Sequence, residues 1–192
     1  MAQITKFENA TSVFAGQGDL IMFDRIDDYD KASFSALANP KSLGQIVQDS
    51  TTFEGEDPET NSILDEQGNT ITATTTAGTI GFSFDIASTS PAMIKEFLMG
   101  QELSDLEGDW AEGITNAVGF GVDLPTQTRP LMVLNDEKTK AFLYPKSKIV
   151  ANITNDEGLY RIHCTVTCEY LDTPTLKTAI VFNASEFKYN NA

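Results

Sequence analysis

Strict alternation of apolar and polar side chains over residues 160–170 constrains the fold of this chain more than any other feature. Apolar or aromatic residues and cysteines occupy the even positions, and charged or hydroxyl-bearing residues occupy the odd ones. A period of two is typical of a strand with one buried face, whereas a helix would repeat every 3.6 residues. Turn residues at 155–158 and an extended run at 148–154 come before it, so we expect an antiparallel hairpin.

The stretch 70–100 predicts a second strand, followed by a short helix. Over 79–86 apolar residues again alternate with small or polar ones, which predicts one face against a core and one polar face. The predicted apolar face consists of Ile80, Phe82, Phe84 and Ile86. The predicted polar face carries Thr79, Ser83 and Asp85.

Helix signals follow this strand directly. Ser90 is a favourable N-cap and Pro91 suits the first helical position, so we expect a helix over 91–99. Gly100 is expected to end it, because glycine is the commonest residue just beyond a helix. One side of the predicted helix carries Ile94, Phe97 and Leu98.

We expect one domain over residues 1–192, because this length can bury a sizeable core and nothing demands a second domain. About seven strand-like runs and one clear helix predict a mainly β fold. The expected architecture is an antiparallel β-sandwich or barrel with one flanking α-helix.

Residues 54–69 predict a long loop, because acidic residues and breakers such as Pro58 and Gly68 interrupt any regular pattern. Three interpretations stay open: a solvated loop, an arm that contacts another subunit through Ile63 and Leu64, or a calcium loop. Calcium is disfavoured, because the acidic residues lack the alternating spacing of known calcium loops. The acidic residues are Glu54, Glu56, Asp57, Glu59, Asp65 and Glu66.

The charge is strongly acidic, with 13 Lys and Arg against 28 Asp and Glu. That balance disfavours a surface that grips nucleic-acid phosphates or anionic lipid. Lys95 is the only basic residue between Lys41 and Arg129, and most basic residues follow that stretch. Such separation is usually a solvated face, but it also suits head-to-tail assembly. Without a signal-peptide pattern or a long apolar run, we expect a soluble protein made in the cytoplasm.

Candidate chemistry is sparse. Cys164 and Cys168 would lie roughly 13 Å apart on one strand, too far for a disulfide, so we expect two reduced core residues. His163, the only histidine, should point to the opposite face, where a solvent-exposed or paired role is expected. We therefore predict no catalytic residues, no metal site and no cofactor, and we do not expect an enzyme.

Three segments taken in order, 43–71, 77–100 and 138–171, resemble bacteriophage tail tube proteins, also called major tail proteins. That family is similar to the tube proteins of contractile injection systems and type VI secretion. The resemblance implies a β-sandwich or barrel with a flanking helix. It also implies subunits that join into hexameric rings, and rings that stack into a tube through which DNA enters the host.

The resemblance further implies roles for the segments predicted above. The helix would brace the outer side of the sandwich, and the 54–69 loop would reach an adjacent subunit or the next ring. Thr79, Ser83 and Asp85 would face the lumen or a neighbouring subunit. An acidic lumen would let DNA pass without specific binding. Implied partners are further copies of this chain and the tape measure, tail terminator and baseplate proteins of a virion tail.

Two other interpretations remain open. A tube subunit of a non-viral contractile injection system would use the same architecture. A β-sandwich binding or decoration module would instead present exposed aromatic residues, such as Trp110 and Tyr160, to a ligand.

Overall fold

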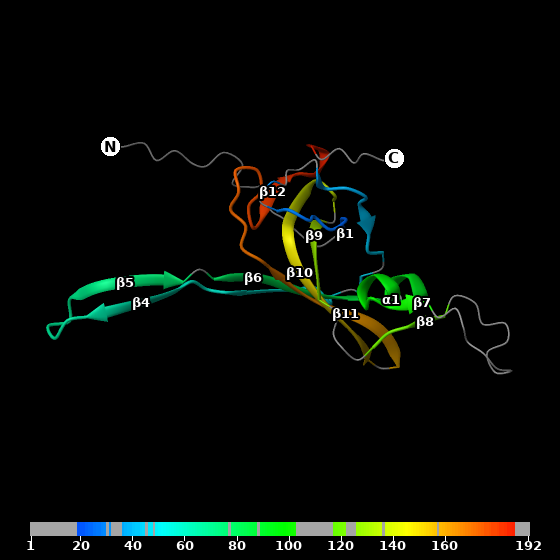
Figure 1. Ribbon diagram of the computed structural model, residues 1–192, viewed down its shortest axis with the longest axis horizontal. Coiled ribbons are helices and arrows are strands. Elements are labelled where there is room, and N and C mark those ends of the chain that lie inside the picture. The colour runs from blue at the N-terminus through cyan, green and yellow to red at the C-terminus, as the bar shows by residue number, and fades with distance from the viewer. Residues whose placement is uncertain are drawn as a thin grey trace.

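The computed structural model describes most of the chain between residues 19 and 186, and within these parts the protein is mainly β with one α-helix. This confirms the predicted fold class, because the strands form an antiparallel curled sheet flanked by that helix (Figure 1). The described residues are 19–29, 31, 36–44, 46–47, 49–76, 78–87, 89–102, 117–121, 126–135, 137–156 and 158–186.

The elements follow one another along the chain with strands on both sides of the helix. They are β1 (Asp19–Met22), β2 (Lys41–Ser42), β3 (Thr52–Glu56), β4 (Glu59–Leu64), β5 (Thr70–Thr76), β6 (Thr79–Ile86), α1 (Pro91–Phe97), β7 (Gln101–Glu102), β8 (Val118–Gly119), β9 (Thr126–Leu134), β10 (Lys140–Asp156), β11 (Leu159–Cys168), β12 (Ile180–Asn183) and a 3₁₀ turn (Ala184–Glu186).

One sheet contains eight of these strands, in the order β2-β1-β9-β10-β11-β6-β3, with β12 also paired to β10. The long strand β10 curves through the centre of Figure 1 and belongs to both halves of the sheet. Its pairing with β9 shifts register between Tyr144 and Ser147. Such an irregularity bends a strand, and here Pro145 lies within it. The bend allows the first half of β10 to pair with β12 and the second half with β11.

The core lies inside this curl and is built from alternate residues of the central strands. In β9, Leu131 and Val133 pack into the main cluster with β6 and β11, while Met132 and Leu134 point into a second cluster. All four are buried, so β9 is covered on both faces. A continuous apolar run is the pattern expected of a strand buried on both sides.

The two strands predicted from alternation are confirmed as β6 and β11, which pair with each other. Phe82, Phe84 and Ile86 are buried as expected, but Ile80 is 39% exposed. Ile80 lies opposite Gly55 of β3, which has no side chain to cover it. The prediction of a fully core-facing apolar row is therefore wrong at this end of β6.

The predicted helix is confirmed, but it ends at Phe97 and its terminus differs from the prediction. Ser90 is the N-cap and its hydroxyl accepts a hydrogen bond from the Met93 amide at 3.4 Å. Met99, not Gly100, takes the left-handed conformation beyond the helix, with φ of 50°. A Cβ at Gly100 would lie 2.5 Å from Cγ1 of Val118, so glycine is required here for close packing.

Glu96 ties α1 to the sheet. Its carboxylate lies 2.5 Å from the Arg129 guanidinium and 3.7 Å from Nζ of Lys41, and its backbone carbonyl accepts a hydrogen bond from the Gln127 side chain at 3.2 Å. The apolar side of the helix also contacts the sheet, with Phe97 and Leu98 buried in the main cluster and Ile94 packed against it. Apolar contacts and ion pairs therefore hold α1 against the sheet.

We expect Glu96→Gln to lower the free energy of unfolding by ~1–2 kcal/mol, because it removes a charge from a half-buried ion pair and leaves Arg129 without its carboxylate. Urea unfolding followed by circular dichroism measures the change. Glu137→Gln, on an exposed turn, is the matched control. Equal stability of the two variants would show that the ion pair contributes nothing.

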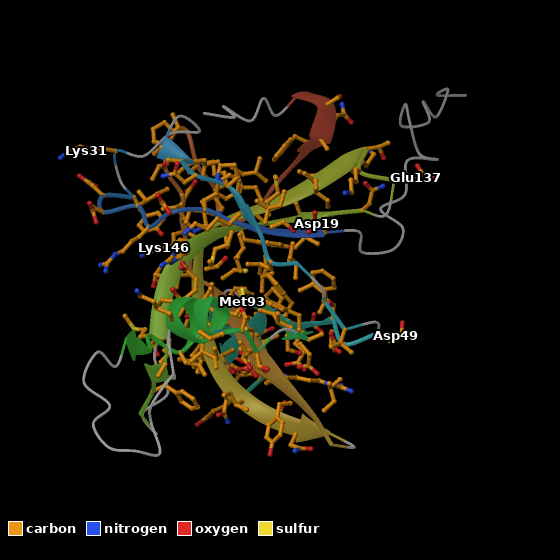
Figure 2. The ribbon with its side chains drawn as sticks, turned by 90° about the vertical axis from the view of Figure 1, so that its right-hand side faces the viewer. Asp19, Lys31, Asp49, Met93, Glu137 and Lys146 are labelled. Atoms are coloured by element: carbon orange, nitrogen blue, oxygen red, sulfur yellow. The ribbon has the colours of Figure 1, made fainter. Side chains whose placement is uncertain are left out.

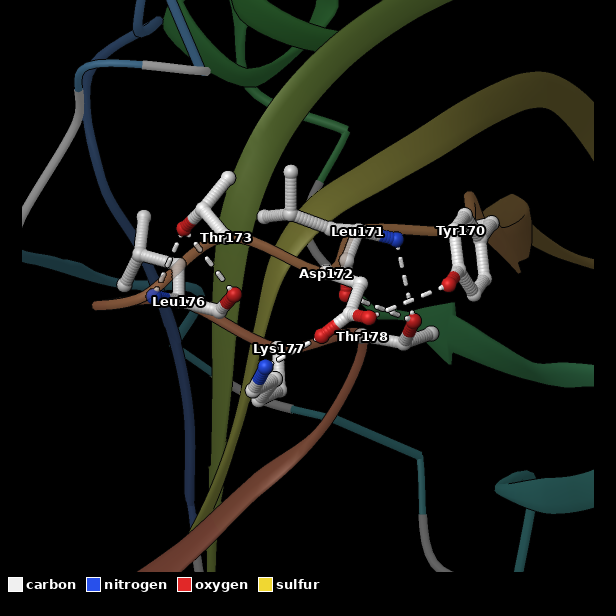
Figure 3. A network of polar contacts seen from close by, with 7 residues as sticks. All are labelled: Tyr170, Leu171, Asp172, Thr173, Leu176, Lys177 and Thr178. Atoms are coloured by element: carbon white, nitrogen blue, oxygen red, sulfur yellow. Dashed lines mark hydrogen bonds and ion pairs between the residues drawn. The ribbon is translucent and has the colours of Figure 1, made fainter.

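The crossing from β11 to β12 is fixed by a local polar network (Figure 3). Lys177 forms an ion pair with Asp172, and the side-chain hydrogen bond from Lys177 holds the pKa of Asp172 below its usual value. The Thr173 hydroxyl donates to the Leu176 carbonyl at 3.1 Å, and the Thr178 hydroxyl accepts from the Leu171 amide at 3.0 Å. The chain thereby turns back so that β12 can pair with β10.

Candidate functional site

A two-stranded arm projects from the sheet and is the most conspicuous feature of the molecule (Figure 1). It consists of β4 and β5, which pair only with each other. Every residue of both strands is exposed. The predicted loop over 54–69 is therefore wrong in its secondary structure, because Glu54 and Glu56 belong to β3 and residues 59–64 form an outgoing strand of a hairpin.

The sequence of the arm explains why it forms a ribbon. Strand β5 reads TITATTT, and β-branched threonine favours extended backbone. Gly68, with φ of 82°, supplies the left-handed position that the tip requires. The threonine run and this glycine were the available signal for a hairpin. The alternation rule missed it because neither face of the ribbon is buried.

Asp65 organises the tip of the arm. Its carboxylate accepts hydrogen bonds from the Asn69 side chain at 2.9 Å and from the amides of Asn69 and Gln67 at 2.7 and 2.9 Å. These bonds, the Asn69 side chain foremost, lower the pKa of Asp65 below its ordinary value of 3.8. The acid predicted as part of a loop is thus the residue that closes the hairpin.

Because the folded-state pKa of Asp65 is lowered, its stabilising effect is present above pH 3.8 and is lost as the pH falls through the folded value. We expect amide exchange at Gln67 and Asn69 to be faster in Asp65→Ala than in the native chain at neutral pH. Asp57→Ala, at an exposed position of the same segment, is the control. Unchanged exchange in Asp65→Ala would contradict this account of the tip.

The arm combines acidic and apolar side chains and lacks cations. From residue 42 to residue 94 the sequence contains no Lys, Arg or His. Near the distal end, Ile63, Leu64 and Ile71 are 62%, 53% and 67% exposed. Of the predicted acids, Glu59 lies at the start of β4 and Asp65 and Glu66 lie at the tip, whereas Glu54 and Glu56 belong to β3 of the main sheet and Asp57 follows that strand.

The second candidate surface is one side of the sheet, which we call the polar face. Residues directly opposite each other in antiparallel strands point to the same side. Thr79, Ser83 and Asp85 of β6 therefore share a side with the polar residues of β11 and β10. Across the strands, the polar face comprises Thr52, Glu54, Glu56, Thr79, Gly81, Ser83, Asp85, Thr126, Thr128, Lys148, Val150, Asn152, Thr154, Arg161, His163, Thr165 and Thr167.

Asp85 is the centre of the charged part of this face. Its Oδ1 lies 2.6 Å from Nδ1 of His163, and its Oδ2 lies 3.6 Å from the Arg161 guanidinium. Its backbone is also fixed, since its amide donates to the Ser50 hydroxyl at 3.0 Å. The expectation that His163 is exposed or paired is confirmed: it pairs with Asp85. The polar face thus carries both signs of charge, with Glu54, Glu56 and Asp85 on the same side of the sheet as Lys148 and Arg161.

The cysteines lie on the opposite, apolar side of β11. Cys164 and Cys168 are both free and buried, which confirms the prediction of reduced core residues. Burial raises the pKa of the Cys164 thiol and raises that of Cys168 to about 12. Both therefore stay protonated at neutral pH, and neither is a reactive nucleophile.

Among the described residues, no three His, Cys, Asp or Glu side chains cluster so as to hold a metal ion. No helix in the same part of the chain has the length and apolar character needed to cross a membrane.

The two aromatic residues considered for a binding module differ in what the structure shows. Trp110 lies outside the described residues, and Tyr160 is exposed near the turn between β10 and β11.

Comparison with known proteins gave no assignment. No protein-family model matches the sequence, and no curated protein matches it.

Proposed function

We propose that this protein is a structural subunit of a bacteriophage tail tube, which assembles as stacked rings, each of six copies by the resemblance described above. The observation that carries the proposal is the fully exposed β4–β5 arm on a curled antiparallel sheet. A two-stranded ribbon with no buried face is marginally stable alone in water. Contact with another subunit would supply the missing burial.

The sheet offers a second reason for assembly. Strand β3 lies at the edge of the eight-stranded sheet, and all five of its residues are exposed. An open edge strand presents unpaired backbone groups that favour pairing with another chain. In the proposed ring, neighbouring subunits would cover these edges.

The polar face suits the wall of a channel for DNA. It is rich in threonine, and its Arg161 guanidinium is turned toward Asp85. A surface with few uncompensated cations does not hold phosphates through counterion release, so DNA can pass without specific binding. Tape measure, tail terminator and baseplate proteins are the other expected partners in the virion.

Negative-stain electron microscopy of the purified protein over a concentration series, with and without its initiator complex, tests the proposal. We expect rings or tubes of uniform width. A protein that stays monomeric under all these conditions would contradict the proposal and favour a binding module, for which a glycan screen with the monomer is the next experiment.

A further inference from the structure

The outer edge of β3 carries two acidic side chains that no nearby cation balances. Glu54 and Glu56 lie two residues apart on the polar side of the strand that ends the sheet. Neither has an ion-pair partner among the described residues. In Figure 2, Asp49, which comes just before β3, lies across the molecule from Lys31 and Lys146.

The cations of the polar face are too distant or already engaged. Lys148 is in register with Glu54, but β11 and β6 lie between their strands, which separates the two backbones by about 14 Å. That distance exceeds the screening length of about 8 Å at physiological salt. Arg161 and His163 both contact Asp85. The β3 edge is therefore a local site of negative charge.

The apolar side of the same edge has an opening at Gly55. Gly55 lies directly opposite Ile80 and has no side chain to cover it, which leaves Ile80 partly exposed. Phe53, on the same side of the strand, is about half exposed. A Cβ at Gly55 would lie 3.0 Å from the carbonyl oxygen of Thr79, so glycine suits this position and keeps it open. We call Phe53, Gly55 and Ile80 the β3 socket.

A strand that pairs with β3 has to match both sides of the edge. Its residue opposite Gly55 points to the apolar side, and the residues before and after it point to the polar side, beside Glu54 and Glu56. A large apolar residue, best an aromatic one, can fold over the glycine and cover the β3 socket. Cations at the two flanking positions neutralise the glutamates. The edge therefore favours the pattern basic, apolar, basic.

The edge strands of a second copy lack this pattern. Pairing of β3 with β3 would place glutamates of the two copies side by side, and opposed like charges destabilise a strand pair. Two basic residues separated by one position occur in the sequence only at 138/140, 146/148 and 161/163. These positions lie in β10, in β11 or in the turn before β10, and both strands already have partners in the sheet. The matching strand therefore belongs to a different protein.

We propose that β3, wherever no neighbouring copy covers it, pairs with an extended segment of a different protein in which two basic residues flank one large apolar residue. The edge is free in the unassembled subunit and at the end of an assembly. This inference rests on the proposed tube function only for the particle to which the partner belongs, and it deepens that function by naming the chemistry of the partner.

Fluorescence anisotropy with labelled synthetic peptides tests the pattern. The probe peptide is Thr-Thr-Lys-Phe-Lys-Thr-Thr, and a permuted peptide of the same composition is Thr-Thr-Lys-Lys-Phe-Thr-Thr. We expect the purified subunit to bind the probe peptide about tenfold more tightly, because only that peptide directs both cations to the glutamate side. Equal affinities would show that the acidic chain attracts any cationic peptide, and would overturn the proposal.

Charge reversal tests where the peptide binds. Glu54→Lys combined with Glu56→Lys should reverse the preference, so that Thr-Thr-Glu-Phe-Glu-Thr-Thr binds more tightly than the probe peptide. Glu59→Lys combined with Glu66→Lys, on the arm, is the matched control, since it changes the total charge equally. A reversal in both double variants, or in neither, would overturn the β3 site.

Hydrogen exchange of the native chain tests the backbone pairing without any substitution. Addition of the probe peptide should slow amide exchange within residues 52–56 and leave the exposed strand β5 unchanged. Unchanged exchange within residues 52–56 would contradict a paired strand.

The possible results separate this inference from the proposed function. A subunit that forms tubes but does not prefer the probe peptide would overturn the β3 site and leave the tube function standing. A subunit that prefers the probe peptide but stays monomeric under all conditions would contradict the tube function and leave the β3 site standing.

Discussion

Replacing residues 57–78 with the dipeptide Asn-Gly should abolish ring stacking while leaving the curled sheet intact. Glu56 lies directly opposite Thr79, so two residues can close the β3–β6 hairpin in a tight turn. The replacement removes β4, β5 and the tip, whose residues make no contribution to the three core clusters. Stability of the subunit should therefore change little.

Two measurements are needed to interpret this variant. Electron microscopy is expected to show single rings or dispersed subunits instead of tubes, and circular dichroism should retain the β signal and the cooperative thermal transition. Loss of the transition would mean that the arm is required for folding. Tubes of normal length would mean that the arm is not a stacking element.

Phe82→Ala should cause the largest loss of stability, ~3–5 kcal/mol in the free energy of unfolding. The Phe82 side chain is fully buried, and its ring lies 5.3 Å from that of Tyr144 and 5.5 Å from that of Phe53. Its removal leaves a cavity at the junction of β6, β10 and β3.

Phe53→Ala is the matched control for Phe82→Ala, because Phe53 contacts the same cluster but is about half exposed. We expect a loss of ~1 kcal/mol for this variant. Urea unfolding by tryptophan fluorescence and circular dichroism gives both values. Equal losses in the two variants would show that Phe82 is no more strongly packed than Phe53, which contradicts its place in the buried core.

The sequence predicted the buried parts of the fold well, because burial on one face leaves a clear pattern. The alternation in β6 and β11 predicted the two strands, and it predicted that Cys164 lies on the apolar side and His163 on the polar side. The arm shows no such alternation. Neither face of its ribbon is buried, so neither face has to be apolar. Its acids and breakers therefore resembled a loop.

The end of α1 shows a different limit of sequence analysis. Gly100 matches the expected helix terminator, yet Met99 takes the left-handed conformation. Gly100 is required because β8 passes so close that a side chain would collide with Val118. A contact between segments distant in sequence is invisible to a local helix rule.

The distribution of charge likewise depended on the fold. Composition predicted an acidic protein, but the strand register decides which acids lie on the polar face. There Glu54, Glu56 and Asp85 lie on the same side of the sheet as Lys148 and Arg161, whereas Glu59, Asp65 and Glu66 lie on the arm. A tube subunit of a non-viral injection device would use the same surfaces. A micrograph of the surrounding particle would distinguish that device from a phage tail.

Reconstruction of the assemblies by electron cryomicroscopy tests the central claim most directly. We expect a hollow tube in which Ser83, Asp85 and Thr165 line the channel, α1 lies toward the outside, and each β4–β5 arm crosses to the next ring. A solid filament, or a tube whose channel is lined by α1, would contradict the account.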